Sequence, residues 1–545
     1  MSLMLDRRAL VKGGAFGLGA LMLPGGAAAL AQLAAARGFT HAVASGEPGQ
    51  DSVLLWTRYI PSGGDSARVS VEVSETADFA RSVAGATMVT GAFRDWTVKL
   101  TVSGLQPGRS YFYRFTANGE VSPVGRTRTL PEGRVREWRM AVFSCANLPF
   151  GYFNAYAHAA ARNDLHLAVH LGDYFYEYKR GVYPSAKEAI EARVLEPANE
   201  LIQLADYRTR YACYRADPDL QALHAALPMI ASPDDHEAAN DTWEGGAENH
   251  DASEGDWTLR KIAARQAWRE WMPVSDEPWG AYEIGDLGTY FRTETRQLGR
   301  SQAPSLEAVL RSGGDPLKAL AAFRDGDWQD PARTMMGTEQ EHWLAQGLSR
   351  SVRARKKWQV VGVGAVMGRV VAPAIAANWI PPGAPAYVAE RLKAAVLAAK
   401  AGLPGNFDDW GGYPAARARL LRNAQAAGAD LVMLAGDSHN GWAFELSESG
   451  KRAGVEFGGH SVTSPGYESY FPGTPPADVA RALVETNAEL KWADTSGRGY
   501  LTVTLTPDAA TGEWLFVDTI AGRSPTVNRT HRMRSRSGRK MLETI

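Results

Sequence analysis

The segment LAVHLGDYFYE, residues 167–177, carries the pattern that decides the fold: a short, mostly apolar run that ends in a glycine and an aspartate. The apolar runs Met140 to Phe143 and Asp430 to Ala435 also end beside polar side chains. Short runs of this kind are typical of strands buried on both faces. Ligand sites in open α/β sheets lie just beyond the carboxyl ends of such strands. The pattern therefore predicts an α/β sheet with a polar site along one edge.

Four polar clusters follow apolar runs in this way. They read FSCAN (143–147), GDYFYE (172–177), DDHE (234–237, after the strand-like run Leu227 to Ala231) and AGDSHN (435–440). Together they bring cysteine, aspartate, tyrosine, asparagine and histidine to strand ends. Carboxylates that bridge cations are how proteins generate hydroxide near neutral pH. We therefore predict a site that holds more than one metal ion.

Each cluster offers ligands of a particular type. Asp173 can bridge two cations through its two oxygens, and Tyr176 can return to the same point from a first helical turn; a phenolate suits Fe(III). Asp437 and His439, two apart in an extended chain, would point the same way and both reach a metal. For Asp173 and Tyr176 a purely structural role is the alternative, and for His439 a satisfied core histidine.

The adjacent carboxylates Asp234 and Asp235 repel each other unless a cation lies between them. The alternative is an acidic turn or helix start, where aspartate is a favoured N-cap. His236 is the natural proton donor to a leaving oxygen. Asn240, one helical turn further on, could add an amide oxygen to the metal site.

Cys145 and Asn147 form an alternate pair on one face of the chain. A thiolate suits a transition metal and an amide oxygen suits calcium, so a site with both would be mixed. The chain has two cysteines. A disulfide between Cys145 and Cys213 is the alternative in an oxidising compartment; otherwise Cys213 reads as a buried helix residue.

Composition is that of a globular chain: 545 residues, 45% hydrophobic, 22% charged, with a net charge of -1. This length predicts a large core and more than one domain, and the charge gives no sign of specific nucleic-acid binding. Residues 1–31, with Arg7-Arg8 and Ala29-Leu30-Ala31, predict a cleaved twin-arginine signal peptide. The alternative is a membrane anchor that stays attached. We expect a periplasmic or extracellular protein, exported by the twin-arginine machinery, with no transmembrane helix in the mature chain.

Beyond the signal peptide we expect three parts. Residues 38–130 show short alternating strands and turns, typical of a fibronectin type III-like or immunoglobulin-like β-sandwich. A linker from Pro131 to Glu137 leads into an α/β domain over 136–525, where strands alternate with helices. The basic tail 526–545 reads as a solvated end, or as a clasp near an anionic site or membrane surface.

The four clusters together resemble the alkaline phosphatase D (PhoD-like) family, within the calcineurin-like and purple acid metallophosphatase superfamily. The resemblance extends to Gly46-Glu47-Pro48, to Leu55-Trp56-Thr57-Arg58, to the Leu105 to Tyr111 turn and to Trp410 to Pro414. It therefore covers most of the mature chain. It implies a four-layer α/β/β/α metallophosphatase domain after the sandwich, and a secreted phosphomonoesterase or phosphodiesterase.

The resemblance also implies cofactors and roles. Fe(III) and Ca(II) are expected, with zinc or manganese as substitutes. Iron would be held by Cys145, Asp173, Tyr176 and His439, and calcium by Asp173, Asp235 and Asp437 together with Asn147 and Asp234. His236 would lie by the phosphate, with Asp173 and His439 in the catalytic centre. Arg296 could steady a phosphate oxygen; the alternative is a surface or helix-packing arginine.

Three positions depart from the family pattern. Pro233 stands where the family has tryptophan, and Gly411 and Glu294 stand where it has aspartate. The metal ligands remain, so these changes bear on ligand orientation and substrate preference. Asp408 or Asp409 could compensate for Gly411.

Substrates implied are small phosphate esters, with phospholipids or nucleic-acid-derived phosphodiesters as further possibilities. One alternative is a phospholipase D-type phosphodiesterase, for which the loop aromatics Trp243, Trp379, Tyr387 and Tyr467 could line an apolar rim. The other alternative is an inactive secreted binding protein.

Overall fold

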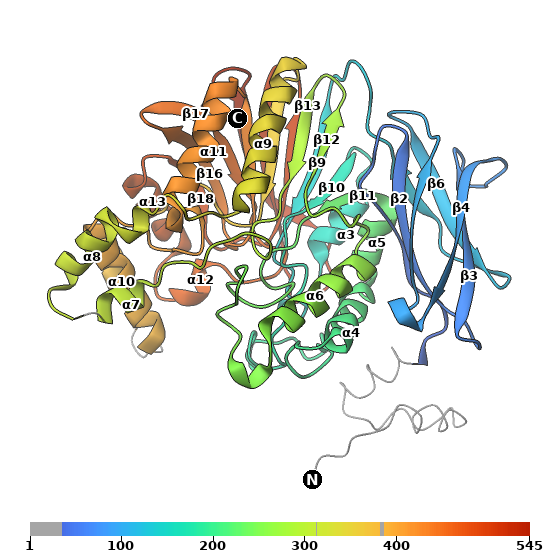
Figure 1. The fold of residues 1–545 in the computed structure, drawn as a ribbon, viewed down its shortest axis with the longest axis horizontal. Coiled ribbons are helices and arrows are strands. Elements are labelled where there is room, and N and C mark those ends of the chain that lie inside the picture. Colours follow the sequence, from blue (N-terminus) through green and yellow to red (C-terminus); the bar gives the residue numbers. More distant parts are fainter. Residues whose placement is uncertain (1–34, 312, 382–385) are drawn as a thin grey trace, which may run out of the picture.

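The computed structural model describes residues 35–311, 313–381 and 386–545 (Figure 1). The predicted signal peptide, residues 1–31, lies outside these ranges. In the described part of the chain no helix combines the length and apolarity needed to cross a membrane.

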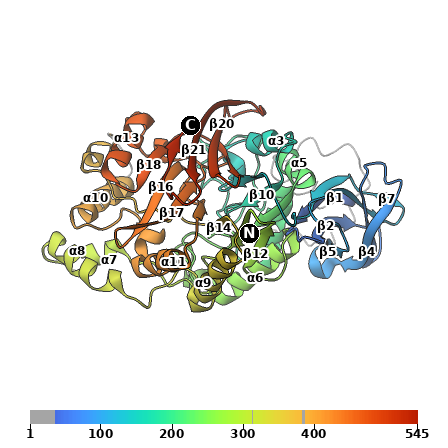
Figure 2. The same cartoon turned by 90° about the horizontal axis from the view of Figure 1, so that it is seen from above.

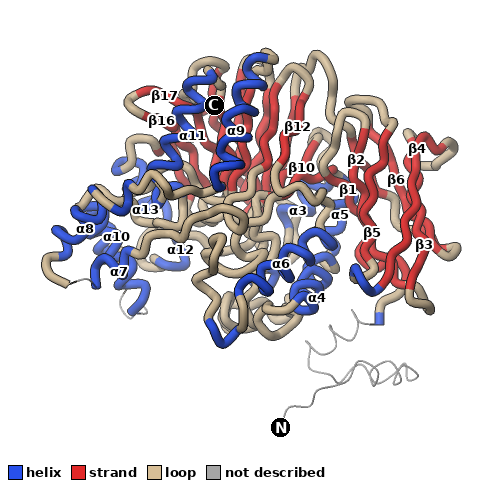
Figure 3. The backbone as a smooth tube through the Cα atoms, viewed as in Figure 1, coloured by secondary structure: helices blue, strands red, loops and turns tan. Residues whose placement is uncertain are grey.

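Two large sheets dominate the described chain, and loops crowd one edge of them (Figure 3). The first sheet has the order β22 (Glu543–Thr544), β21 (Val527–Arg536), β20 (Ala509–Val517), β19 (Gly499–Leu505), β9 (Trp138–Phe143), β10 (Leu167–His170), β11 (Pro228–Ala231), β1 (Gly38–Gly46), β2 (Ser52–Ile60) and β5 (Thr97–Ser103). The second has the order β12 (Gly280–Ile284), β13 (Gly288–Arg292), β14 (Trp358–Val363), β15 (Leu431–Ala435), β17 (Lys451–Gly458), β16 (Gly441–Glu448) and β18 (Leu490–Asp494).

The two sheets pack face to face. Met140 and Val142 of β9 lie in one buried cluster with Val360 of β14 and Val432 of β15, while the intervening Ala141 points to the opposite face. Both faces of these strands are therefore buried, which explains their unbroken apolar runs.

Helices cover the two outer faces. On the first sheet lie α3 (Asn154–Ala160), α4 (Leu204–Arg215), α5 (Pro218–Ala226) and α6 (Trp257–Trp271). On the second lie α9 (Gly337–Arg353), α11 (Pro414–Ala427) and α13 (Pro476–Thr486). The remaining helices are α7 (Leu306–Arg311), α8 (Pro316–Asp325), α10 (Ala386–Lys400) and α12 (Tyr467–Tyr470). The predicted α/β/β/α layering is confirmed.

Helix α11 illustrates how the sequence sets an element. Pro414 begins it with a preset φ, and Gly428 ends it in the left-handed region at φ 72°. Leu420, Leu421 and Ala424 lie on one face and pack against the second sheet. Full burial of each leucine contributes about 1.5–3 kcal/mol.

The N-terminal part is the predicted all-β sandwich, at one end of the molecule (blue in Figure 2). One layer is formed by β3 (Ser66–Ser74), β4 (Ser82–Gly91), β6 (Ser110–Ala117), β7 (Glu120–Val121) and β8 (Gly125–Arg128). The other layer is β1, β2 and β5, and it continues into the first large sheet because Ser45 and Gly46 of β1 pair in parallel with Pro228 and Met229 of β11. The sandwich and the α/β layers therefore share a sheet.

The basic tail, residues 526–545, has a structure that differs from the predicted solvated end. Residues Val527 to Arg536 form β21, which pairs along β20, and Met533 is buried between the sheets. Arg534 and Arg536 both contact Glu543 of β22. The reading of 526–545 as a solvated end is wrong, because arginines that alternate with smaller residues form a strand with one inward face.

Candidate metal centre

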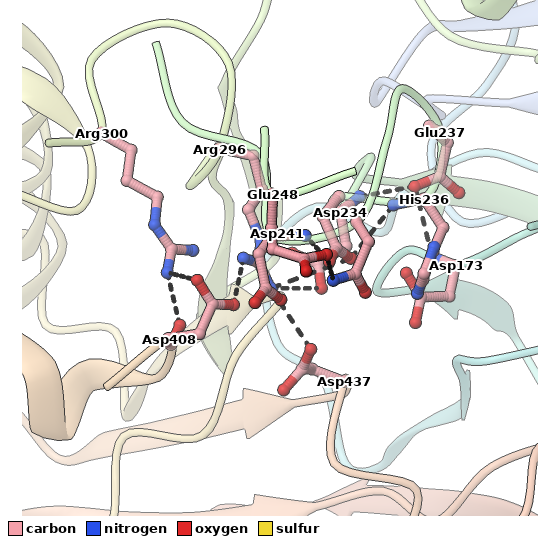
Figure 4. Close-up of polar contacts among 12 residues, drawn as sticks. Asp173, Asp234, His236, Glu237, Asp241, Glu248, Arg296, Arg300, Asp408 and Asp437 are labelled. Carbon is pink, nitrogen blue, oxygen red and sulfur yellow. Dashed lines mark hydrogen bonds and ion pairs between the residues drawn. The ribbon is translucent and has the colours of Figure 1, made fainter. Parts of the chain in front are cut away.

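The polar clusters lie close together, at the carboxyl ends of parallel strands from both sheets. In the first sheet, parallel strands β9, β10 and β11 lead to Cys145, Asp173 and Asp234. In the second sheet, β15 leads to Asp437 and His439. Figure 4 shows the aspartates from both sheets facing one another around Arg296. The sheet edge thus gathers candidate ligands that are far apart in the chain.

One group combines soft and hard ligands. Ligand atoms of Cys145, Asp173 and His439 lie within 4.8 Å of one another. The Tyr176 hydroxyl lies 3.1 Å from His439 Nε2 and 3.3 Å from Asp173 Oδ2, and it accepts a 2.7 Å hydrogen bond from Ser464. His439 Nδ1 donates to the Pro465 carbonyl at 2.8 Å, which leaves Nε2 with its lone pair toward the group.

The other groups contain carboxylates. Their ligand atoms again lie within 4.8 Å of one another, in the sets Asp234–Asp235–Asp437, Asp173–Asp235–His236 and Asp235–Asp241–Asp408. Asp173 and Asp235 each belong to more than one set, so both are placed to bridge neighbouring cations. Asp241 was not predicted. Its backbone N–H donates to Asp235 at 2.7 Å, a loop closure that has no signature in the sequence.

The candidate ligands have unusual backbone conformations. Cys145, Asp173, Asp437 and His439 have φ of 61°, 50°, 61° and 61°, and Asp241 has 51°. Left-handed conformation is uncommon outside glycine and concentrates at functional sites. The expectation that Asp437 and His439 lie in extended chain and point the same way is therefore wrong: they turn, and they join different groups.

Glu237 and Glu177 form hydrogen bonds that connect the loops after β10 and β11. Glu237 accepts hydrogen bonds from the backbone amides of Asp173, Tyr174 and Asp234 at 3.2, 2.6 and 2.7 Å, so it ties the loop after β10 to the loop after β11. Glu177 accepts from His236 Nδ1 and from the Asn240 amide, both at 2.7 Å. These carboxylates hold ligands in place.

His236 is buried and packs against Tyr176, with ring centroids 4.2 Å apart. Burial disfavours its charged form, but Asp235 and Glu177 outweigh that effect and raise the pKa of His236 well above its usual value. Because Nδ1 donates to Glu177, Nε2 is the nitrogen available to a ligand.

Arg296 is fully buried among carboxylates (Figure 4). Its Nε and Nη2 lie 2.6 and 3.1 Å from the two oxygens of Asp234, Nη2 lies 3.2 Å from Asp437, and Nη1 lies 2.5 Å from Asp408. The alternative of a surface or helix-packing arginine is wrong, because the buried guanidinium contacts three carboxylates. Glu294 positions the residue by accepting from the amides of Arg296 and Gln297 at 2.9 and 2.7 Å.

The candidate ligands Asn147 and Asn240 differ in their side-chain contacts. Asn147 Oδ1 is buried without a hydrogen-bond partner within the described residues, as is Asp173 Oδ1. The Asn240 side chain donates to Glu248 at 3.1 Å, and within the described residues it forms no hydrogen bond with the aspartates. Asn147 therefore has an oxygen available to a cation, whereas the Asn240 amide nitrogen is bonded to Glu248.

The donor set fits cations. Burial raises the pKa values of Asp173 and Asp437, and burial together with Asp173 raises the pKa of the Cys145 thiol. Buried acids without partners are costly, and a bound cation removes that cost by favouring the charged forms. Both cysteines are free thiols, so the alternative disulfide is not formed; Cys213 instead contacts backbone of residues 194 and 196.

Asp408 and Asp409, near Gly411, have different contacts, as do the loop aromatics. Asp408 contacts Arg296 and Arg300, whereas Asp409 accepts from the Gly411 amide at 2.7 Å, so Asp408 is the one that joins the carboxylates. Trp379 is 7% exposed and Tyr467 packs against the same core cluster. The Tyr387 side chain lies outside the described part.

Comparisons with known proteins agree with this arrangement. A family model described as PhoD-like phosphatase matches residues 140–514, and a model of the PhoD-like phosphatase N-terminal domain matches residues 25–131. Alkaline phosphatase D of Bacillus subtilis (strain 168) is 32% identical over 493 residues, which are 86% of this chain and 76% of that protein. The solved structure of PhoD matches with a TM-score of 0.76 at 27% identity, over 94% of this chain and 92% of that chain.

Proposed function

The chain belongs to the PhoD-like phosphatase family and is a phosphoric ester hydrolase, and we propose that it is an exported enzyme with a mixed iron and calcium site. The observation that carries the proposal is the convergence of a thiol, a phenol, an imidazole and several carboxylates from both sheets. Asp173 joins the Cys145 group to the Asp235 group. Shared carboxylates of this kind are expected in a site for more than one cation.

Ligand hardness divides the residues between metals. Iron would be held by the thiolate of Cys145, the phenolate of Tyr176, His439 and Asp173. Calcium would be held by oxygen ligands, namely Asp173, Asp235, Asp437, Asn147 and Asp234. When bound, these cations supply Lewis acidity toward phosphate oxygens and a source of hydroxide near neutral pH.

The chain's own residues supply positioning and a proton. Water provides the attacking oxygen, the bond from phosphorus to the leaving oxygen breaks, and His236 Nε2 gives that oxygen its proton. Glu177 orients the imidazole through Nδ1 at 2.7 Å. Arg296 holds Asp234 and Asp437, which come from different sheets, in fixed positions.

Substrates and location follow from the same proposal. We infer export by the twin-arginine machinery to the periplasm or outside, and small phosphate esters as substrates, either mono- or diesters. Trp379 is buried in the core, which weakens the phospholipase-type alternative, whereas Trp243 and Tyr467 are partly exposed. Convergence of the ligands argues against an inactive binding protein.

Metal analysis of protein exported with its native signal tests the proposal. We expect iron and calcium in stoichiometric amounts, together with hydrolysis of a phosphomonoester or a simple phosphodiester. Cys145→Ser should lose iron and turnover. Tyr176→Phe should lose a visible phenolate-to-iron absorption band, whereas Tyr156→Phe, at a buried tyrosine bonded to His170, should keep it. Full iron content and turnover in Cys145→Ser would contradict the iron assignment.

A further inference from the structure

We propose that Tyr178 and Tyr183 form a subsite beside the metal centre that receives a planar aromatic leaving group. The inference rests on the proposed hydrolase function and names a preference that the function leaves open. It concerns the long connection between β10 and α4, which carries both tyrosines.

Tyr178 lies beside the proposed proton donor His236, and Tyr183 lies beside Tyr178. Tyr178 lies 5.4 Å from the His236 ring, and Tyr183 lies 5.6 Å from the Tyr176 ring, measured between centroids. Tyr178 and Tyr183 meet edge to face at 5.8 Å and 74°. A leaving group that takes its proton from His236 must depart on the side of that imidazole. Tyr178 is the next ring to this imidazole after Tyr176, and Tyr183 packs against both tyrosines.

Buried groups hold the backbone that carries the two rings, and Phe150 packs on one of them. Arg210, fully buried, donates from Nη2 to the Tyr178 carbonyl at 3.2 Å. Asn147 Nδ2 donates to the Tyr183 carbonyl at 3.4 Å. Phe150 packs edge to face on Tyr183 at 5.0 Å. The rings are therefore preorganised, which reduces the entropy cost of stacking a ligand.

Their outer edges are available. Both tyrosines are half-buried, and within the described ranges no hydrogen bond is formed by either hydroxyl. The subsite thus offers two aromatic faces or edges and two free hydroxyls. Those features suit an uncharged aromatic group, because stacking and edge contacts add about 0.5–1.5 kcal/mol beyond area burial.

The test compares benzyl phosphate with ethyl phosphate, whose leaving alcohols have similar acidity. For Tyr178→Ala and Tyr183→Ala, kcat/KM for benzyl phosphate should fall roughly 2- to 10-fold, while that for ethyl phosphate changes less than about 2-fold. Tyr→Phe at either position should keep most of the benzyl preference. Tyr152→Ala, at a half-buried tyrosine that contacts Arg193 and Arg523, is the matched control and should leave both rates unchanged.

A second readout keeps this inference separate from the proposed function. Benzylphosphonate should raise the unfolding temperature of metal-loaded wild type more than ethylphosphonate does, and the difference should vanish in Tyr178→Ala. Equal effects of each variant on both esters and both phosphonates, with unchanged metal content, would overturn the subsite. Failure of wild type to hydrolyse both monoesters and a simple phosphodiester would instead count against the hydrolase function, and the phosphonate comparison would still decide the subsite.

Discussion

Replacing Arg296 by glutamine should destabilise the metal-free protein far more than the metal-loaded one. The guanidinium lies 2.6–3.2 Å from Asp234 and Asp437 and 2.5 Å from Asp408, and it is fully buried. Removing one partner of a buried ion pair costs about 3–5 kcal/mol, because the other charge is left uncompensated. Bound cations would compensate the same carboxylates, so the cost should shrink by more than half once metals are present.

Urea unfolding with and without a chelator measures this difference. Arg296→Lys keeps the positive charge but loses the bidentate hydrogen bonds to Asp234. Its urea midpoint should therefore lie between those of wild type and Arg296→Gln. Arg311→Gln is the control, because its ion pair with Glu307 is exposed and contributes little. The reasoning fails if Arg296→Gln unfolds at the wild-type urea concentration in chelator, or if it loses equal stability with metals bound.

Two further outcomes follow from contacts in the described residues. Gly364→Ala would place a Cβ 2.0 Å from Asp234 Oδ1, so turnover should fall on the order of 100-fold. The control Gly63→Ala, at a position with open space around it, should keep full activity. Equal activities of the two variants would refute the predicted clash. Burial lowers the pKa of His460 to about 4, so the unfolded chain, with a histidine pKa near 6.5, binds more protons between those pH values. The free energy of unfolding should therefore fall by up to about 3 kcal/mol as pH drops from 6.5 to 4, and His460→Gln should flatten that slope when stability is measured across the window.

Local patterns in the sequence predicted the α/β class and the central strands, whereas the four-layer arrangement was implied by the family resemblance. Apolar runs buried on both faces marked the central strands, such as Met140 to Phe143 within β9, and the alternation of strands with helices was expected over residues 136–525. These features depend on local periodicity and composition, which a single chain displays directly.

Long-range pairing had no such signature. The parallel pairing of β1 with β11 joins segments that are far apart in the chain. No local sequence pattern near Gly46 predicts this pairing. The strand near the C-terminus was hidden because four of the ten residues from Val527 to Arg536 are arginines and only Met533 and Ser535 are buried.

The site was predictable as a set of strand-end clusters, but its internal geometry was not. Periodicity suggested extended pairs at Asp437 and His439, whereas left-handed turns divide them between two groups. Arg296 shows the same limit: its residue type suits phosphate, and only the fold reveals that aspartates from both sheets already surround it.

Anomalous diffraction from crystals of the exported protein tests the central claim most directly. We predict an iron peak bonded to Cys145, Asp173, Tyr176 and His439, and a second, lighter cation sharing Asp173 or Asp235, with ligand distances of about 2.0–2.6 Å. Crystals of active enzyme in which Asp173, Asp235 and His439 bind no ion would contradict the account.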